Sequence, residues 1–416
     1  MNIVKETPYT KQTETKINVI DSIMGSGKTS WAIQYMNEAN SDKNFIFITP
    51  LLSEVQRVKE SVTSRKFIAP ENEGKGKFDN LKKLLINEHN IVSTHALFQK
   101  ADDEIIELLR IGNYTLILDE VMDVIDQYKM EKDDFKLLID NNMVSVEKNT
   151  GLVCWNDESE YQETRYNEIK PLAKTENLYF FENTILFWTF PVSVFNAFEE
   201  VYIMTYLFQH QEQRYYYDMY NVSYSYKAVQ KLNDTYVLVN HSDKEPYDKS
   251  LIKSLINIYD GKLNNIGEEK NAFSFSWFKK ESNKHLVDKL NKNIYSYFRN
   301  NVRTPAKLNM WTCFKDDIPK LKGKGYSKGY VPFNSRATNT FKDKVSLAYV
   351  VNRFMNPYKL KFFKSKGVEV NQELYALSEL IQWIWRSRIR DNQPINLYIP
   401  SKRMRTILIR YLNSDL

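Results

Sequence analysis

The chain has 416 residues, of which 42% are hydrophobic and 26% are charged. These are ordinary globular values, so they exclude a fully disordered chain and a collagen-like fibre. The length suits two domains of roughly 200 residues each. No apolar run reaches the roughly 20 residues that cross a bilayer, and the first residues lack the apolar core of a secretory signal. We therefore expect a cytoplasmic protein with no membrane partner.

The net charge of +6 is unevenly distributed along the chain. Residues 1–200 contain 22 Lys and Arg against 33 Asp and Glu, a balance of −11, whereas residues 201–416 contain 36 against 19, a balance of +17. A strongly basic half suggests a polyanionic partner, which is usually nucleic acid. The alternative is a lysine-rich composition without a binding role, and charge alone does not separate the two.

The first half alternates short apolar runs with helical patterns, which is typical of parallel strands joined by crossover helices. We expect strands at residues 17–23, 44–48, 90–93, 114–118, 185–190 and 200–204, and helices at 29–40 and 54–61. Residues 150–182 are acidic and aromatic with no clear period, which predicts an inserted hairpin or surface loop. Residues 207–230 are interpreted as the crossing between domains.

The second half repeats the alternation. We expect strands at residues 235–239, 272–276, 308–312, 330–333, 346–350 and 395–399, and helices at 249–259, 284–298, 372–389 and 402–412. The pattern predicts an α/β protein with two consecutive units of similar size, residues 1–206 and 207–416.

Residues 22–29, SIMGSGKT, lie between an expected strand and an expected helix. Such a loop curls its backbone amides around phosphates at the helix N-terminus, here with Gly25, Ser26 and Gly27. Lys28 can reach the β and γ phosphates, and the Thr29 hydroxyl can bind Mg²⁺. Ser22 stands where the full pattern has glycine.

A second motif follows the apolar strand at 114–118, which ends in Asp119 and Glu120. Hydrolysis of a nucleoside triphosphate needs one carboxylate for Mg²⁺ and another to activate water. We assign the first role to Asp119 and the second to Glu120.

With these motifs placed, the chain resembles superfamily 2 helicases of the DEAD/DEAH-like type. Thr49 and Pro50 follow the second expected strand, as the family's first nucleic-acid-contact motif does, and Thr94 and His95 resemble the next contact motif. Thr205 ends a strand where the family has its coupling motif. The resemblance implies two tandem RecA-like domains that use ATP and Mg²⁺ and bind nucleic acid.

The sixth motif of the family carries an arginine finger, and residues 382–390 resemble it. Gln382 and Arg386 match the family pattern, but Ile389 occupies the second arginine position. On a continuous helix Gln382, Arg386 and Arg390 share roughly one face. We therefore favour Arg386 and Arg390 as the catalytic arginines and Gln382 as a nucleotide contact, with Arg388 as the alternative.

Two further segments of the second half are candidates for nucleic-acid contact. The first resembles the family's fifth motif and includes Arg336, Thr338 and Asn339. The second interleaves lysines with glycine and tyrosine, so that Lys322 and Lys324 could follow phosphates while Tyr326 and Tyr330 stack on bases. The alternative for this second segment is an ordinary solvated loop.

These features predict an ATP-dependent nucleic-acid translocase or helicase, acting on DNA more than RNA and similar in style to bacteriophage replication helicases. A phage origin would place it in the host cytoplasm, as a monomer that meets replication proteins. Two alternatives remain: an ATPase switch that remodels or anneals strands without unwinding, and a genome-packaging motor.

Overall fold

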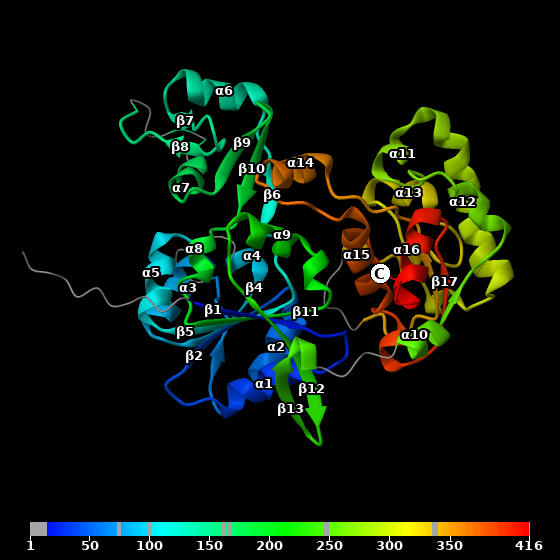
Figure 1. The fold of residues 1–416 in the computed structure, drawn as a ribbon, viewed down its shortest axis with the longest axis horizontal. Coiled ribbons are helices and arrows are strands. Elements are labelled where there is room, and N and C mark those ends of the chain that lie inside the picture. Colours follow the sequence, from blue (N-terminus) through cyan, green and yellow to red (C-terminus); the bar gives the residue numbers. More distant parts are fainter. Residues whose placement is uncertain are drawn as a thin grey trace, which may run out of the picture.

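The structure, a computed structural model, describes residues 15–72, 76–98, 101–159, 164, 166, 168–243, 249–334 and 340–415. They form two α/β units and an insertion, with the larger sheet below the insertion and the second unit beside it (Figure 1). Parallel strands dominate both sheets, which confirms the predicted fold class. Within these residues, each helix is too short or too polar to span a bilayer.

The first sheet has eight strands and is parallel except at one edge. In spatial order they are β13 (Thr235–Asn240), β12 (Ser225–Leu232), β1 (Lys16–Asp21), β11 (Glu200–Thr205), β5 (Tyr114–Asp119), β2 (Asn44–Thr49), β4 (Asn90–Thr94) and β3 (Phe67–Ile68). β12 and β13 form an antiparallel hairpin, whose first strand pairs in parallel with β1. The first sheet therefore extends to Asn240, beyond the division expected after residue 206.

Helices cover both faces of this sheet because its buried strands alternate their side chains between the two faces. Val19 and Leu118 contact one helical layer, whereas Ile20 and Ile117 contact the other. The first layer contains α3 (Lys77–Ile86), α4 (His95–Phe98), α5 (Asp103–Ile111), α8 (Val192–Phe195) and α9 (Glu212–Met219). The second contains α1 (Lys28–Glu38) and α2 (Leu52–Ser61).

The insertion is larger than the hairpin or surface loop expected at 150–182. Its three-stranded antiparallel sheet has the order β6 (Ile125–Tyr128), β10 (Ile185–Thr189) and β9 (Leu178–Phe181). It also contains α6 (Lys132–Asp140), β7 (Val144–Val146), β8 (Val153–Trp155) and α7 (Ile169–Lys174), packed around a small apolar core. The run at 185–190 is thus an antiparallel strand of the insertion, not a parallel strand of the main sheet.

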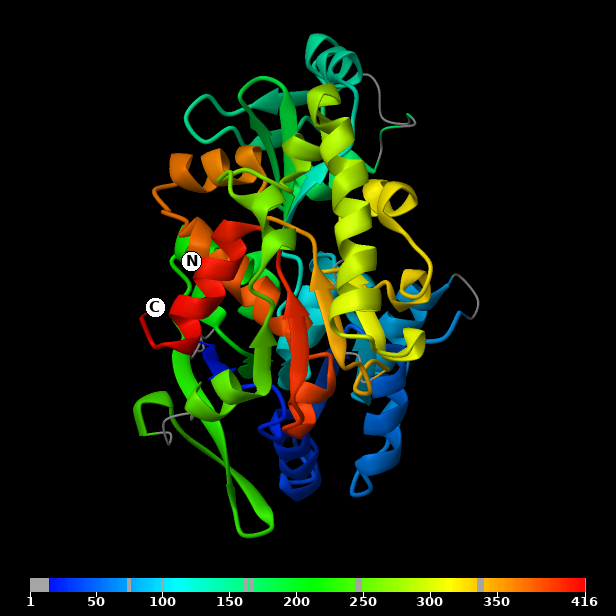
Figure 2. The ribbon, with the colours of Figure 1, turned by 90° about the vertical axis from the view of Figure 1, so that its right-hand side faces the viewer.

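The second sheet has four parallel strands in the order β14 (Ile256–Ile258), β17 (Ile395–Tyr398), β16 (Ser346–Tyr349) and β15 (Asn309–Thr312). One face contacts α10 (Lys249–Leu255), α15 (Gln372–Ile384) and α16 (Lys402–Leu412). The other contacts α11 (Phe275–Lys279), α12 (Lys284–Ser296) and α13 (Ile318–Leu321). Figure 2 looks onto this unit, with α12 in front of the strands.

Four predicted elements of the second unit differ from the structure. The strand expected at 272–276 is a turn that leads into α11, because Ser274 caps that helix by accepting a hydrogen bond from the Trp277 amide. The helix expected at 249–259 stops at Leu255 and continues as β14. The helix expected at 372–389 stops at Ile384. At 330–333, Tyr330 makes only a single bridge, to Trp311.

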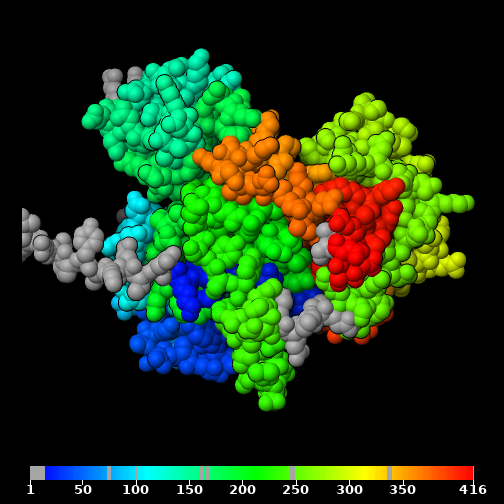
Figure 3. All heavy atoms as spheres, viewed as in Figure 1, coloured from blue at the N-terminus to red at the C-terminus, as the bar shows by residue number. Residues whose placement is uncertain are grey.

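α14 (Pro357–Ser365) connects the second unit to the first unit and the insertion (Figure 3). Phe362 is buried among Tyr179, Phe181 and Phe187, and Phe363 joins the same apolar core. The two units therefore share a core through this helix.

Candidate nucleotide site and interdomain groove

The loop between β1 and α1 has the backbone that phosphate binding needs. Gly25 and Gly27 have φ angles of 86° and 92°, a left-handed region that favours glycine. Lys28 Nζ donates to the carbonyl oxygens of Ser22 at 2.6 Å and Ile23 at 3.0 Å. Burial lowers the pKa of Lys28 to about 8, against the opposing effect of Glu120 and other nearby carboxylates.

Ser22 is accommodated by the strand that lies beside it. Its Oγ accepts a hydrogen bond from the Val229 amide of β12 at 2.9 Å. A glycine here would leave that buried amide without this acceptor. The departure from the usual phosphate-loop pattern is thus linked to the extra hairpin at the sheet edge.

Asp119 ends β5 directly opposite the phosphate loop. Thr29 Oγ1 donates to Asp119 Oδ1 at 3.2 Å, and Thr49 Oγ1 donates to Asp119 Oδ2 at 3.4 Å. Burial raises the Asp119 pKa to about 6, and the nearby carboxylates of Glu54 and Glu120 act in the same direction. A hydroxyl beside a carboxylate is a donor set that suits Mg²⁺.

Glu120 follows in a left-handed backbone conformation, with a φ of 106°. Its Oε1 accepts a hydrogen bond from Thr205 Oγ1 at 2.7 Å, which joins the ends of β5 and β11. That bond holds the Glu120 carboxylate at the carboxyl edge of the sheet. Thr205, expected at the coupling position, therefore contacts the carboxylate assigned to water activation.

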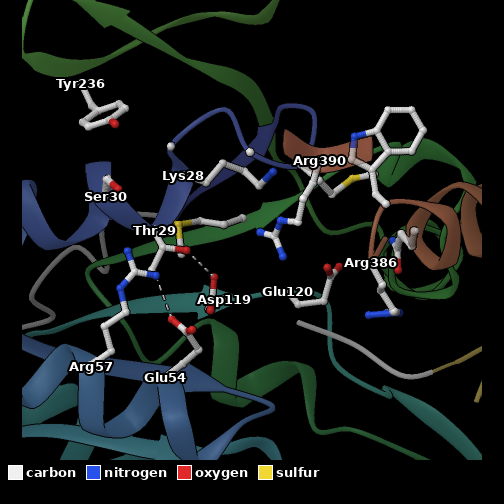
Figure 4. A pocket seen from close by; sticks show the side chains of 16 residues that line it. Lys28, Thr29, Ser30, Glu54, Arg57, Asp119, Glu120, Tyr236, Arg386 and Arg390 are labelled. Atoms are coloured by element: carbon white, nitrogen blue, oxygen red, sulfur yellow. Dashed lines mark hydrogen bonds and ion pairs between the residues drawn. The ribbon is translucent and has the colours of Figure 1, made fainter. Parts of the chain in front are cut away.

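The second unit contributes Gln382, Arg386 and Arg390 to the same cavity. Arg390 points between Lys28 and Glu120 (Figure 4). Because α15 ends at Ile384, the predicted continuous helical face is wrong, and a turn followed by a 3₁₀ segment, Arg388–Asp391, brings Arg390 into the cavity. Arg388 does not line it, and its Nε donates to Pro394 O at 2.5 Å.

The cavity has a volume of about 310 Å³ and lies between the two units. Its lining includes Gly25, Gly27, Lys28, Thr29, Asp119, Glu120, Gln382, Arg386 and Arg390. Ser26 does not line this cavity, and its buried Oγ has no hydrogen-bond partner among the described residues. The residues present thus fit a nucleoside triphosphate and Mg²⁺.

Sequence reasoning missed several lining residues, among them Glu54, Arg57 and Tyr236. Glu54 is buried on α2 and accepts a hydrogen bond from Arg57 at 3.1 Å. The only sequence signal for Glu54 is the position of its carboxylate shortly after the Thr49–Pro50 motif, and this signal is weak. Tyr236 lies on the edge hairpin, and nothing in the local pattern places it beside the phosphate loop.

A second cavity, of about 840 Å³, runs between the units. Pro50, Thr94 and His95 line it from the first unit, and Phe333, Asn334, Arg353 and Tyr375 line it from the second. Thr49 is fully buried beneath it, with its hydroxyl on Asp119. Gln382 lines both this interdomain groove and the nucleotide cavity. Arg336, Thr338 and Asn339 lie outside the described residues.

The predicted tyrosine stacking next to Lys322 and Lys324 is wrong. Tyr326 is 1% exposed, stacks on Phe298 and donates to Leu321 O, and Tyr330 packs against Trp311. Both rings belong to the core of the second unit. Lys322 and Lys324 are exposed but line neither cavity.

Comparison with solved structures supports the same fold. An XPD helicase structure matches with a TM-score of 0.51 and 11% identity, over 96% of this chain and 94% of that chain. The structure of S. tokodaii Xpd4 matches with a TM-score of 0.46 and 13% identity, over 95% and 94% of the two chains. The XPD match shows a helicase-like fold.

Comparison with sequence families identifies two regions of the chain. The YonV middle domain matches residues 125–188, and the YonV C-terminal Rossmann-like domain matches residues 250–412. The SPbeta prophage-derived protein YonV of Bacillus subtilis (strain 168) is 45% identical over 411 residues, which cover 96% of this chain and 99% of that protein. The chain therefore belongs to the YonV family.

Proposed function

We propose that this protein is an ATP-dependent nucleic-acid motor of the superfamily 2 helicase type. One observation carries the proposal: Lys28, Thr29 and the Asp119–Glu120 pair of the first unit line one cavity with Arg386 and Arg390 of the second. A metabolic phosphate-loop enzyme does not require arginines from a second α/β unit, whereas a motor that closes around its nucleotide does.

Each of these residues has a chemical role in hydrolysis. Lys28 and the loop amides hold the β and γ phosphates, and Thr29 and Asp119 would hold Mg²⁺, which would neutralise charge on the phosphate oxygens. Glu120, fixed by Thr205, orients the attacking water and accepts its proton. Arg386 and Arg390 stabilise the charge that develops on the γ phosphate.

The interdomain groove is the proposed path of a nucleic-acid strand. Arg353 and Lys359 line it, but each pairs with an acid, Glu379 and Glu212 respectively. These pairs exchange for phosphate contacts when a strand enters, so binding should weaken strongly with added salt. Gln382 lines both the groove and the nucleotide cavity. Gln211 lines the groove and contacts Thr205. These two glutamines thus link the proposed strand to the nucleotide.

One chain supplies both halves of the proposed site, which supports action as a monomer. The prophage origin of the relative supports a place in the host cytoplasm and a role in phage DNA metabolism. DNA as the preferred strand, and a division into two motor domains with an insertion, belong to the same proposal.

The decisive experiment measures ATP hydrolysis with and without single-stranded DNA, duplex DNA and RNA. The proposal expects stimulation by at least one of them, and loss of turnover in Lys28→Ala with strand binding retained. Absence of stimulation by all three would refute it.

A second candidate, a switch that binds or anneals strands without separating a duplex, is favoured by α14. Phe362 and Phe363 anchor the second unit in the core of the first, which restricts how far the units can part. Strand displacement on forked and flush duplexes separates the candidates, because the switch hydrolyses ATP but releases no strand.

A further inference from the structure

The hairpin of β12 and β13 is fixed to the nucleotide site at several points. β12 pairs with β1, and its Val229 amide donates to Ser22 at the start of the phosphate loop. On β13, the Tyr236 amide donates to Gln34 Oε1 of α1 at 2.9 Å. The hairpin therefore holds a defined position over the loop and the first turns of α1.

The ring of Tyr236 lies directly against the phosphate loop. A Cβ atom built on Gly27 would lie 2.1 Å from Tyr236 Cε1, so only glycine leaves room for the ring. The ring is nonetheless only partly buried, and it lines the nucleotide cavity with Ser30. An aromatic surface thus faces the cavity at the loop.

The two ends of the cavity differ in chemistry, and this difference orients a nucleotide. Glu120, Arg386 and Arg390 lie at one end, where the γ phosphate must sit for hydrolysis (Figure 4). Tyr236 and Ser30 lie at the other end (Figure 4). A triphosphate with its γ phosphate beside Glu120 directs its nucleoside toward Tyr236.

We propose that Tyr236 is the stacking platform for the nucleobase. The inference deepens the proposed function and rests on it. An aromatic face recognises the π surface of a base at little conformational cost. Recognition by stacking depends on a flat purine ring more than on its hydrogen-bonding edge, so ATP and GTP should bind with similar affinity.

The test compares ATP with inorganic tripolyphosphate, which has the phosphates but no base. Calorimetric titrations of the full chain with Mg²⁺ are expected to show that Tyr236→Ala weakens ATP binding about tenfold and leaves tripolyphosphate binding unchanged. Tyr236→Phe retains the ring and should bind ATP as the unaltered chain does. Tyr295→Ala, which alters a 40% exposed tyrosine on α12, is the matched control.

The outcomes separate this inference from the proposed function. If Tyr236→Ala weakens the binding of ATP and of tripolyphosphate equally, the ring only shapes the loop and the inference is wrong. The inference is also wrong if the binding of neither ligand changes. Tyr236→Leu provides a second variant that fills the space beside Gly27 without a π face, and it should resemble Tyr236→Ala. If the unaltered chain binds neither probe, the proposed function fails, and the inference fails with it.

Discussion

The Thr205 hydroxyl donates to Glu120 Oε1 at 2.7 Å and lies 3.0 Å from Oε1 of Gln211. Glu120 lines the nucleotide cavity, whereas Gln211 lines the interdomain groove. One hydroxyl therefore touches both a proposed catalytic carboxylate and a residue that faces the proposed strand. Movement of Gln211 on strand binding would change how Thr205 holds Glu120.

Removing this hydroxyl should uncouple the two cavities. Thr205→Val keeps the shape of the side chain but loses the hydrogen bond to a charged acceptor, so strand-stimulated ATP turnover should fall about 10- to 100-fold. ATP binding should stay unchanged, because Thr205 does not line the nucleotide cavity. Steady-state kinetics measures the turnover, and calorimetry measures the ATP binding. Thr205→Ser retains the hydroxyl and should restore turnover. Full strand stimulation in Thr205→Val would contradict the coupling role.

The three arginines after α15 should differ in their effect on hydrolysis. Arg386→Ala and Arg390→Ala should each lower the turnover number about a thousandfold, the scale of an arginine finger. Arg388→Ala is the matched control, because Arg388 binds the Pro394 carbonyl outside the cavity. Single-turnover hydrolysis of bound ATP checks this order. If only Arg388→Ala lowered the turnover number strongly, Arg388 would be the arginine finger instead of Arg386 and Arg390.

ATP affinity should depend on pH through Lys28, because burial lowers the pKa of this side chain to about 8. Phosphates favour the charged ammonium, so affinity should be highest below pH 8 and fall as the pH rises through that value. Titrations at pH 7 and pH 9 measure the change. Lys28→Arg stays charged and should remove the slope. Equal affinities of the unaltered chain at the two pH values would contradict a phosphate contact by a lysine with this lowered pKa.

The Mg²⁺ dependence of ATP binding should change with pH through Asp119, because burial raises the pKa of this carboxyl group to about 6. Below that value the carboxyl group is protonated and loses its affinity for the ion, so more Mg²⁺ should be needed for tight ATP binding at pH 5 than at pH 7. ATP itself titrates in this range, so Asp119→Asn, which cannot titrate, gives the background slope. Asp133→Asn, which alters an exposed carboxylate on α6 of the insertion, should behave as the unaltered chain does. If the unaltered chain showed the same pH dependence as Asp119→Asn, metal binding by an Asp119 with this raised pKa would be contradicted.

The local sequence was sufficient for features that depend on neighbouring residues. The phosphate loop, the Asp119–Glu120 strand end and the helix 402–412 all occur where their patterns predicted them. A glycine loop before a helix, an apolar run and a helical period are each set by residues close in the chain. The α/β class with parallel sheets follows from the same short-range alternation.

Only the tertiary structure decided which distant segments meet. The β12–β13 hairpin joins the first sheet because β12 pairs with β1, some 200 residues earlier. That pairing uses backbone N–H and C=O groups, which do not depend on the identity of the side chains. Packing of Trp385 in the second core accompanies the end of α15, and the following turn, not a helical face, places Arg390 in the cavity. Tyr236 reaches Gly27 by the same long-range pairing. The uneven charge of the two halves is a property of the sequence, but the cavity that lies between them exists only in the folded chain.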